Sequence, residues 1–226
     1  MFNSLILADK EGVKRGLKQP FYVVKEALDP KYAEQLYDEL LQFNHWTGES
    51  EKTFQGEGVP ELNKDYSYQR QSIPTSAPKA PATLLKLDAY LNSTEFLTWM
   101  NDVSGRKCDY FAGSATRFGP GDHITRHNDD LTVTRSDGLN HRRAVTVNYW
   151  LTRDWQPDWG GQFVWETPYT EIVPTFNTLV IFLPGPSTQH WVEPVAESVP
   201  EPRLSVTGWF LTTYNKGGGR LRLNLG

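Results

Sequence analysis

The chain has little of three features that would each commit a protein to a particular class. Cys108 is the only cysteine among 226 residues, which excludes an internal disulfide and suits a reducing compartment. No run of about 18 apolar residues occurs, so the sequence predicts no transmembrane helix. The formal net charge is -4, so the chain offers no basic footprint for nucleic acid.

The first residues also lack the features of a secretion signal. Two acidic side chains, Asp9 and Glu11, follow a very short apolar run, and no cleavage-like site of small residues comes after it. Together with the single cysteine and the missing transmembrane helix, this predicts a cytoplasmic protein with no membrane or nucleic-acid partner.

Apolar and aromatic residues, by contrast, are abundant. Hydrophobic residues make up 38% of the chain and aromatic residues 13%, including eight tryptophans. That is enough to build a buried core and too much for a disordered chain. At this length we expect one domain of roughly 200 residues with an N-terminal extension.

Residues 1–108 are expected to form a supporting region of helices, with one strand at 21–24. Asp29 and Pro30 are typical of a helix start, as the N-cap and the first helical residue. The helix that follows has one apolar stripe at helical spacing, formed by Tyr32, Leu36, Leu40 and Phe43. Two more helices are expected, at residues 81–91 and from Ser93 or Thr94 to Gly105.

Between these helices, residues 47–71 are polar, contain glycine and show no clear period. We interpret this segment as a long loop or an irregular strand. Long loops in compact domains are often functional, so the segment is a candidate lid over a site elsewhere in the chain.

From Asp109 the pattern changes to short strands separated by turns rich in glycine, proline and aspartate, which is typical of a β-sandwich or barrel. The expected strands are 110–118, 123–127, 144–151, 162–165, 178–183, 189–194 and 204–212. Because the helices precede the strands, we expect them to pack on one face of one sheet. The prediction is a mainly β chain of the α+β class and a single domain, with a β core at 109–214 and a flexible tail at 215–226.

His127 and Asp129 are candidate metal ligands. In a strand, side chains two residues apart point to the same face, so this imidazole and this carboxylate would lie side by side. His190 follows the apolar strand at 178–183 through a Pro-Gly-Pro turn that can bring it alongside the pair. Two histidines and one carboxylate would leave three positions open on an octahedral Fe(II). Alone, an H-x-D spacing is a weak signal, because Asn128-Asp129-Asp130 also fits a plain surface turn.

Arg203 is a candidate anchor for an anionic ligand. It alternates with Leu204 along the last strand and shares a face with Thr207. Either this polar face lies in water, or it points into a barrel, where a buried guanidinium needs an anionic partner such as a dicarboxylate. Strand parity alone does not decide between the two. The order of the pieces, His-x-Asp, then His, then Arg on the next strand, favours the second.

In this order the pieces resemble the Fe(II)/2-oxoglutarate dioxygenases, and specifically the prolyl-4-hydroxylase-like branch that includes the ribosomal-protein and HIF-type prolyl hydroxylases. The resemblance covers about residues 118–210. The matching pieces are FGPGD (118–122), HND (127–129), RRAVTVNYWL (142–151), DW (154–155), GGQF (160–163), NTLVIF (177–182), HWV (190–192) and RLSVTGWF (203–210).

The resemblance implies a double-stranded β-helix, or jelly roll, with the N-terminal helices packed on one sheet. It implies that His127, Asp129 and His190 bind Fe(II) and that Arg203 pairs with the distal carboxylate of 2-oxoglutarate. The implied reaction is hydroxylation of an unactivated C–H bond, with release of succinate and carbon dioxide. Fe(II), 2-oxoglutarate and O2 are the expected cofactor and co-substrates, with ascorbate as an optional addition.

The remaining pocket residues follow from the same resemblance. Thr207 is placed to add a hydroxyl hydrogen bond to the co-substrate. Where the family often has a tyrosine that assists the co-substrate, this chain has Phe118 and Trp150. Asn148 shares the face of Trp150 by parity and is a candidate replacement, whereas Tyr149 should face away.

The leading hypothesis for the substrate is a prolyl residue in a protein or peptide. The same chemistry on a free amino acid or another small molecule is the alternative. A non-catalytic binding module of this fold predicts missing ligands, and all three are present here. A cupin-like metal hydrolase or isomerase would not need Arg203 and Thr207.

Overall fold

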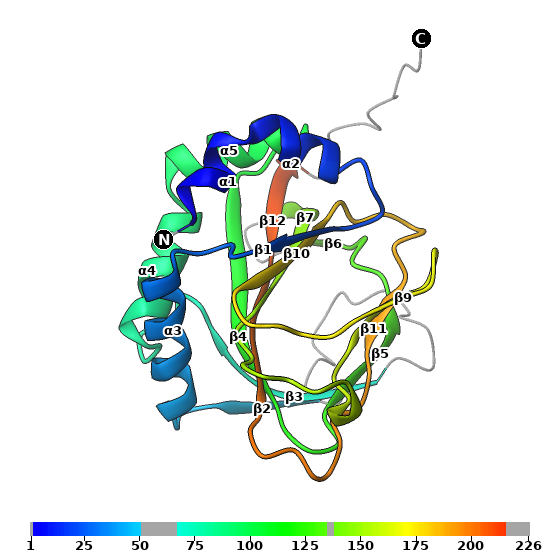
Figure 1. Cartoon of the computed structure of the whole chain (residues 1–226). Helices are drawn as coiled ribbons and strands as arrows, with labels where there is room; N and C mark the ends of the chain where they lie inside the picture. Colours follow the sequence, from blue (N-terminus) through cyan, green and yellow to red (C-terminus); the bar gives the residue numbers. More distant parts are fainter. Residues whose placement is uncertain (1, 51–66, 135–137, 216–226) are drawn as a thin grey trace.

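One curled sheet is the framework of the molecule. The computed structural model describes residues 2–50, 67–134 and 138–215, and within them twelve strands join into this sheet (Figure 1). Its strands are β1 (Tyr22–Lys25), β2 (Thr47–Ser50), β3 (Tyr68–Pro74), β4 (Tyr110–Phe118), β5 (His123–His127), β6 (Thr132–Thr134), β7 (Leu139–Trp150), β8 (Phe163–Trp165), β9 (Thr170–Ile172), β10 (Thr178–Phe182), β11 (His190–Val192) and β12 (Arg203–Asn215).

Neighbouring strands pair antiparallel in the order β1-β10-β7-β12-β4-β3-β5-β11-β8-β9, with β2 beside β3 and β6 beside β7. The long strands β4, β7 and β12 form the major half of the sheet, and the short strands β5, β11, β8 and β9 form the minor half (Figure 1). The sheet curls so that these halves face each other across what we call the barrel interior. Aromatic and aliphatic side chains fill much of it, among them Trp150, Phe163, Trp165, Val180 and Phe182. This arrangement confirms the predicted jelly roll.

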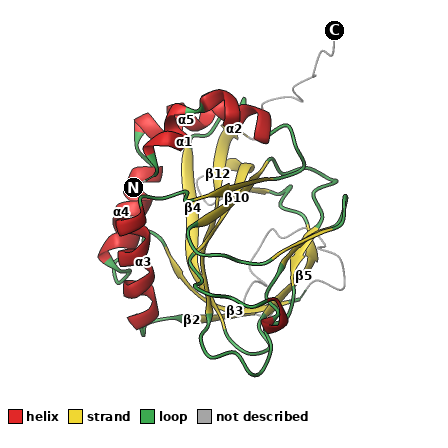
Figure 2. Ribbon diagram, in the orientation of Figure 1, coloured by secondary structure: helices red, strands yellow, loops and turns green. Residues whose placement is uncertain are grey.

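Helices cover the outer face of the major half (Figure 2). They are α1 (Ser4–Ala8), α2 (Lys10–Gly16), α3 (Pro30–Gln42), α4 (Ala82–Leu91) and α5 (Thr94–Ser104), with a short 3-10 helix at Pro157–Trp159. The packing is mostly aliphatic with an aromatic centre: Phe210 of β12 lies 5.9 Å from Phe96 of α5 and 5.2 Å from Phe111 of β4, between ring centroids. Burial of three such rings contributes roughly 2–3 kcal/mol each. Within the described residues, no helix is long and apolar enough to span a membrane.

The strand expected at 21–24 is confirmed as β1, which lies between α2 and α3. The helices do not precede all the other strands, because β2 and β3 lie between α3 and α4. β1 pairs with β10, and β3 lies between β4 and β5. The first 108 residues therefore complete the sheet as well as cover it, because strands β10 and β4 would otherwise present unpaired edges.

The segment at 47–71, which we expect from the sequence to be a long loop or an irregular strand, has regular strands at both ends. These are β2 and the beginning of β3, which pair with each other. Its middle, residues 51–66, is outside the described residues, and the lid prediction falls there. The same holds for 216–226 of the expected tail, whereas Asn215 is the last residue of β12.

Helix ends follow the capping rules. Asp29 accepts a hydrogen bond from the Tyr32 N–H at the start of α3, and Ser93 does the same for Phe96 in α5. Gly105 ends α5 with a φ of 64°, the left-handed conformation that glycine adopts at no steric cost. α1 and α2 were not expected, because helices of five and seven residues are marginal by themselves and depend on tertiary packing.

Asn177 fastens the N-terminal region to the sheet. Its side-chain oxygen accepts the Leu28 N–H at 2.9 Å and also a bond from the Tyr149 hydroxyl, and its amide donates to the Leu28 carbonyl at 2.9 Å. All of these groups are buried. Asn177 also has a φ of 54°, which asparagine tolerates better than most residues.

We therefore expect Asn177→Ala to lower the free energy of unfolding by about 2–4 kcal/mol, because it leaves buried donors and an acceptor without hydrogen-bond partners. Urea unfolding followed by circular dichroism measures this. Asn177→Gly separates the contribution of the hydrogen bonds from that of the positive φ, because glycine adopts this φ without strain but has no side chain to form hydrogen bonds. A glycine variant as stable as the wild type would show that the hydrogen bonds contribute nothing.

Candidate metal centre

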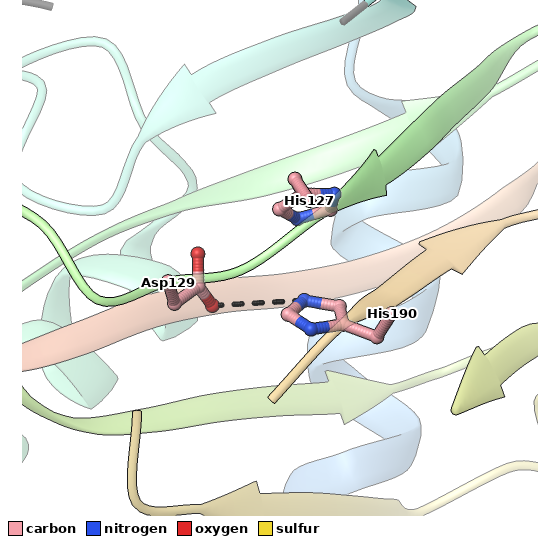
Figure 3. Close-up of side chains that lie close together, drawn as sticks. All are labelled: His127, Asp129 and His190. Atoms are coloured by element: carbon pink, nitrogen blue, oxygen red, sulfur yellow. Dashed lines mark ion pairs between the residues drawn. The ribbon is translucent and has the colours of Figure 1, made fainter. Parts of the chain in front are cut away.

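Two histidines meet across one strand pair. His127 is the last residue of β5, His190 is the first residue of β11, and the two are paired in the antiparallel register. Their rings lie 4.3 Å apart between centroids. Asp129 comes two residues after His127 and points toward the same place (Figure 3). Residues far apart in sequence are thus joined by the pairing of two short strands.

The three side chains can present one ligand atom each, and these atoms all lie within 4.8 Å of one another. The His190 Nε2 is 3.8 Å from the Asp129 Oδ2 (Figure 3). The Nδ1 of His127 lies 2.7 Å from the Thr125 carbonyl, and the Nδ1 of His190 lies 2.8 Å from the Thr188 carbonyl. Because a carbonyl only accepts, both Nδ1 atoms donate, which leaves the Nε2 lone pairs available to a metal.

Asp129 does not reach the site in the way that we expected. The strand β5 ends at His127, so strand alternation does not align the carboxylate. Arg143 and Thr146 of β7 hold it instead. The Arg143 Nη1 donates to Oδ1 at 2.7 Å, and the Thr146 hydroxyl donates to Oδ2 at 3.0 Å. The sequence analysis missed both residues, although Thr146 shares the parity of Asn148 and Trp150.

The protonation states suit a divalent cation. Burial lowers the pKa of His127 to about 3 and also lowers the pKa of His190. Burial alone would raise the pKa of Asp129, but Arg143 and the two histidines outweigh it and hold that pKa at about 2. At neutral pH the site therefore presents two neutral imidazoles and one carboxylate, which are the forms that bind metal.

Aromatic rings surround the buried histidine. Phe163 lies 5.1 Å from His190 and Phe182 lies 5.0 Å from it, and Trp165 stacks on it at 5.9 Å, all between ring centroids. His190 is 4% exposed. These rings keep water from that side of the cluster and fix the orientation of the imidazole.

Arg203 is a second buried charged group beside the aromatic rings of the barrel interior. It begins β12, is 1% exposed, and sits between the rings of Phe118 and Trp150, with Cζ 5.1 Å and 5.9 Å from their centroids. Its Nη1 is 3.4 Å from the Ser205 hydroxyl, whereas Nε and Nη2 have no hydrogen-bond partner among the described residues. Burial lowers the pKa of Arg203 to about 9. A buried guanidinium in this state lacks the anion that would compensate it.

The other predicted pocket residues fall on two faces. Asn148, Trp150 and Thr207 lie on the side of Arg203, and the Thr207 hydroxyl donates to the Asn148 Oδ1 at 3.2 Å. The Trp150 Nε1 is buried and, like the two Arg203 nitrogens, has no partner among the described residues. Tyr149 faces the helical side, where it bonds Asn177.

The lowered histidine pKa makes the stability of the metal-free protein depend on pH. An unfolded histidine takes up a proton near pH 6.5. Folded His127 does so only near pH 3, so the unfolded state binds more protons in between and stability falls as the pH falls. Between pH 7 and 5.5 we expect His127 to contribute a loss of about 1 kcal/mol.

Urea unfolding in the presence of a chelator, at the two pH values, measures this loss. His127→Asn should lose less stability over the interval than the wild type. His45→Asn, at an exposed position, should behave like the wild type. An equal loss of stability in all three proteins would contradict the attribution of this loss to His127. The lowered pKa of Asp129 acts at lower pH, since its contribution is lost only as the pH falls through about 4 to 2.

Comparison with known proteins finds a family that is similar to the β core of the chain. Residues 113–211 match the family described as the 2OG-Fe(II) oxygenase superfamily. No curated protein matches the chain. The matched residues include all three members of the histidine–carboxylate cluster and Arg203.

Solved structures share the fold at low sequence identity. A prolyl-4-hydroxylase from Pseudomonas putida has a TM-score of 0.62 at 23% identity, over 89% of this chain and 97% of that chain. A prolyl hydroxylase from Trichoplax adhaerens, in complex with a hypoxia inducible factor oxygen degradation domain peptide fragment, has a TM-score of 0.61 at 19% identity, over 92% and 93%. A prolyl 4-hydroxylase from Phytophthora capsici has a TM-score of 0.64 at 16% identity, over 93% and 65%. The β core at 113–211 is thus similar to the 2OG-Fe(II) oxygenase superfamily, and the chain shares the fold of these prolyl hydroxylases.

Proposed function

We propose that the protein is an Fe(II)- and 2-oxoglutarate-dependent dioxygenase that hydroxylates a prolyl residue in a protein or peptide. The observation that supports this most strongly is the pairing of two features in one barrel interior. One feature is the cluster of two histidines and one carboxylate, and the other is a buried arginine, Arg203, whose Nε and Nη2 lack a partner among the described residues. The rings of Trp150 and Phe163 connect Arg203 to His190. A hydrolase or isomerase of similar fold needs the first feature but not the second.

The cluster fits Fe(II). The His127 Nε2, the His190 Nε2 and one oxygen of Asp129 would hold it and leave three positions open, as this ligand set does on octahedral iron. When bound, the iron supplies the oxidation of an unactivated C–H bond with O2 and 2-oxoglutarate, and the protein supplies binding and orientation.

Arg203 fits the distal carboxylate of 2-oxoglutarate. A carboxylate accepts two parallel N–H bonds from one guanidinium, and charge assistance makes these bonds strong. The Trp150 indole adds a third N–H beside it, and an indole N–H only donates, so this end of the pocket matches an acceptor. Thr207 and Asn148 bond each other, so Trp150 is the better candidate for the role that a tyrosine often has in the family.

The prolyl substrate rests on the likeness to prolyl hydroxylases, one of which was solved with a peptide bound. The identities of 16–23% make this likeness one of fold, so the substrate is the finer part of the proposal. A free amino acid treated by the same chemistry is the alternative, and the assay below separates the two.

The class is tested by succinate formation. Anaerobically Fe(II)-loaded protein, given 2-oxoglutarate and air, should release succinate slowly without substrate. His127→Ala should abolish this succinate formation, because the two remaining ligands are not enough to hold the iron. Arg203→Ala should raise the 2-oxoglutarate concentration for half-maximal rate about 30-fold or more, because a buried charge pair loses one partner. Succinate formation unaffected by both variants would contradict the proposal.

The substrate is tested with proline-containing peptides and free amino acids under the same conditions. We expect a mass increase of one oxygen atom on a peptide, located at proline by fragmentation. Hydroxylation of free amino acids alone would overturn the peptide assignment and leave the reaction class intact.

Arg203 also predicts a trade between stability and binding. The charge of Arg203 is buried beside aromatic rings. In the absence of ligands, we therefore expect Arg203→Met to raise the free energy of unfolding by about 1–4 kcal/mol, measured by urea unfolding. The same variant should lose the stabilisation that 2-oxoglutarate gives to Mn(II)-loaded wild type.

Arg117→Met is the matched control, since Arg117 lies on the neighbouring strand β4 and bonds Gln71 outside the pocket. It should keep the full shift in Tm on addition of 2-oxoglutarate. A wild type that is not stabilised by 2-oxoglutarate would argue against Arg203 as its binding residue.

A further inference from the structure

Asp129 is held by a basic side chain that the reaction does not by itself require. The Arg143 Nη1 donates to the Asp129 Oδ1 at 2.7 Å. The guanidinium of Arg143 also lies over Trp209, with Cζ 3.6 Å from the ring centroid. The guanidinium thus contacts the carboxylate with its edge and the indole with its face.

The two oxygens of Asp129 are in different situations. Oδ1 is committed to Arg143. Oδ2 accepts a neutral bond from the Thr146 hydroxyl at 3.0 Å and faces the His190 Nε2 at 3.8 Å. Each oxygen has two lone-pair positions and one of these hydrogen bonds, so their directions distinguish them: Oδ2 is the oxygen that lies 3.8 Å from the His190 Nε2. The two contacts together fix the rotation of the carboxylate about its Cβ–Cγ bond.

We propose that Arg143, held flat by Trp209, is a positioning residue that makes Asp129 a ligand through Oδ2 alone. This rests on the proposed function, because it concerns the metal that the three side chains would hold. If both oxygens turned to the metal, they would take one of the positions that the two co-substrates need. Arg143 prevents that rotation by its own bond to Oδ1.

The chemistry of the side chain explains why arginine stands here. A guanidinium is planar and offers several fixed N–H donors, so it can stack on a ring and bond a carboxylate at the same time. A lysine ammonium keeps the charge but has no plane with which to stack. The Arg143 side chain is 21% exposed and that of Asp129 is 5% exposed, so water screens the contact weakly.

The preceding residue provides a matched control. Arg142 also pairs with an aspartate, Asp130, at 3.2 Å, but its side chain is 53% exposed. The two arginines are adjacent in sequence and each contacts one of two adjacent aspartates. They differ in whether that aspartate belongs to the cluster.

The experiment titrates full-length wild type, Arg143→Gln, Arg143→Lys and Arg142→Gln with Mn(II) and Co(II), which the same ligands bind. Mn(II) affinity comes from electron paramagnetic resonance, and the visible spectrum of bound Co(II) reports the ligand geometry. We expect Arg143→Gln to weaken Mn(II) binding about 10- to 100-fold and to change the Co(II) spectrum. Arg143→Lys should recover part of the affinity but not the wild-type spectrum, and Arg142→Gln should match the wild type in both.

Each outcome has one meaning. If wild type binds Mn(II) and Arg143→Gln binds it equally well with an unchanged Co(II) spectrum, the positioning role is overturned and the proposed function stands. If wild type binds neither metal, the proposed function fails first. If Arg143→Gln does not fold, Arg143→Lys decides: a wild-type Co(II) spectrum in that variant overturns the proposal, and an altered spectrum supports it. An equal loss of affinity in Arg142→Gln would also overturn it, because the effect would then be one of net charge.

Discussion

The pairing of β5 with β11 is the constraint on which the rest of the site depends. It sets His127 opposite His190 and thereby fixes two nitrogens of the cluster with backbone hydrogen bonds. Both strands are short, and each is supported by another neighbour, β3 on one side and β8 on the other. The position of the imidazoles is therefore a property of the sheet rather than of a mobile loop, which suits a site that must hold its ligands rigidly.

Charge is distributed in the barrel interior in two ways. Asp129 is ionised and compensated by Arg143, whereas Arg203 is charged and uncompensated by any anion among the described residues. A buried unpaired charge costs free energy, and the apolar packing between the helices and the outer face of the major half offsets it. The outer face of the major half thus contributes stability, and its inner face carries the residues of the site.

The sequence predicts the helix starts and part of the site, but it does not predict the direction of every side chain in the site. Alternation along β12 correctly groups Arg203 with Thr207, and the caps at Asp29 and Ser93 locate α3 and α5. Alternation does not predict the direction of the Arg143 side chain, because β7 is irregular. Phe210 pairs with Val145 but Leu211 pairs with Arg143, so Ala144 is an extra residue. Such a bulge reverses the alternation beyond it and turns Arg143 toward Asp129, which no hydrophobic pattern in the sequence reveals.

Asp129 shows a second limit of prediction from pattern. The spacing of His127 and Asp129 suggested a continuous strand, yet the strand ends at the histidine. The carboxylate is placed by side chains from β7, a strand that comes later in the chain. The structure brings the two predicted side chains together with a geometry other than the expected one, since tertiary contacts rather than local alternation set the direction of the carboxylate.

In the proposed reaction, the cluster and Arg203 bind one metal and one 2-oxo diacid together. Anaerobic addition of 2-oxoglutarate to the Fe(II)-loaded protein, followed by visible absorption, tests it most directly. A metal-to-ligand charge-transfer band that saturates at one 2-oxoglutarate per chain is the predicted result. A protein that binds Fe(II) but develops no band at any 2-oxoglutarate concentration would contradict the claim.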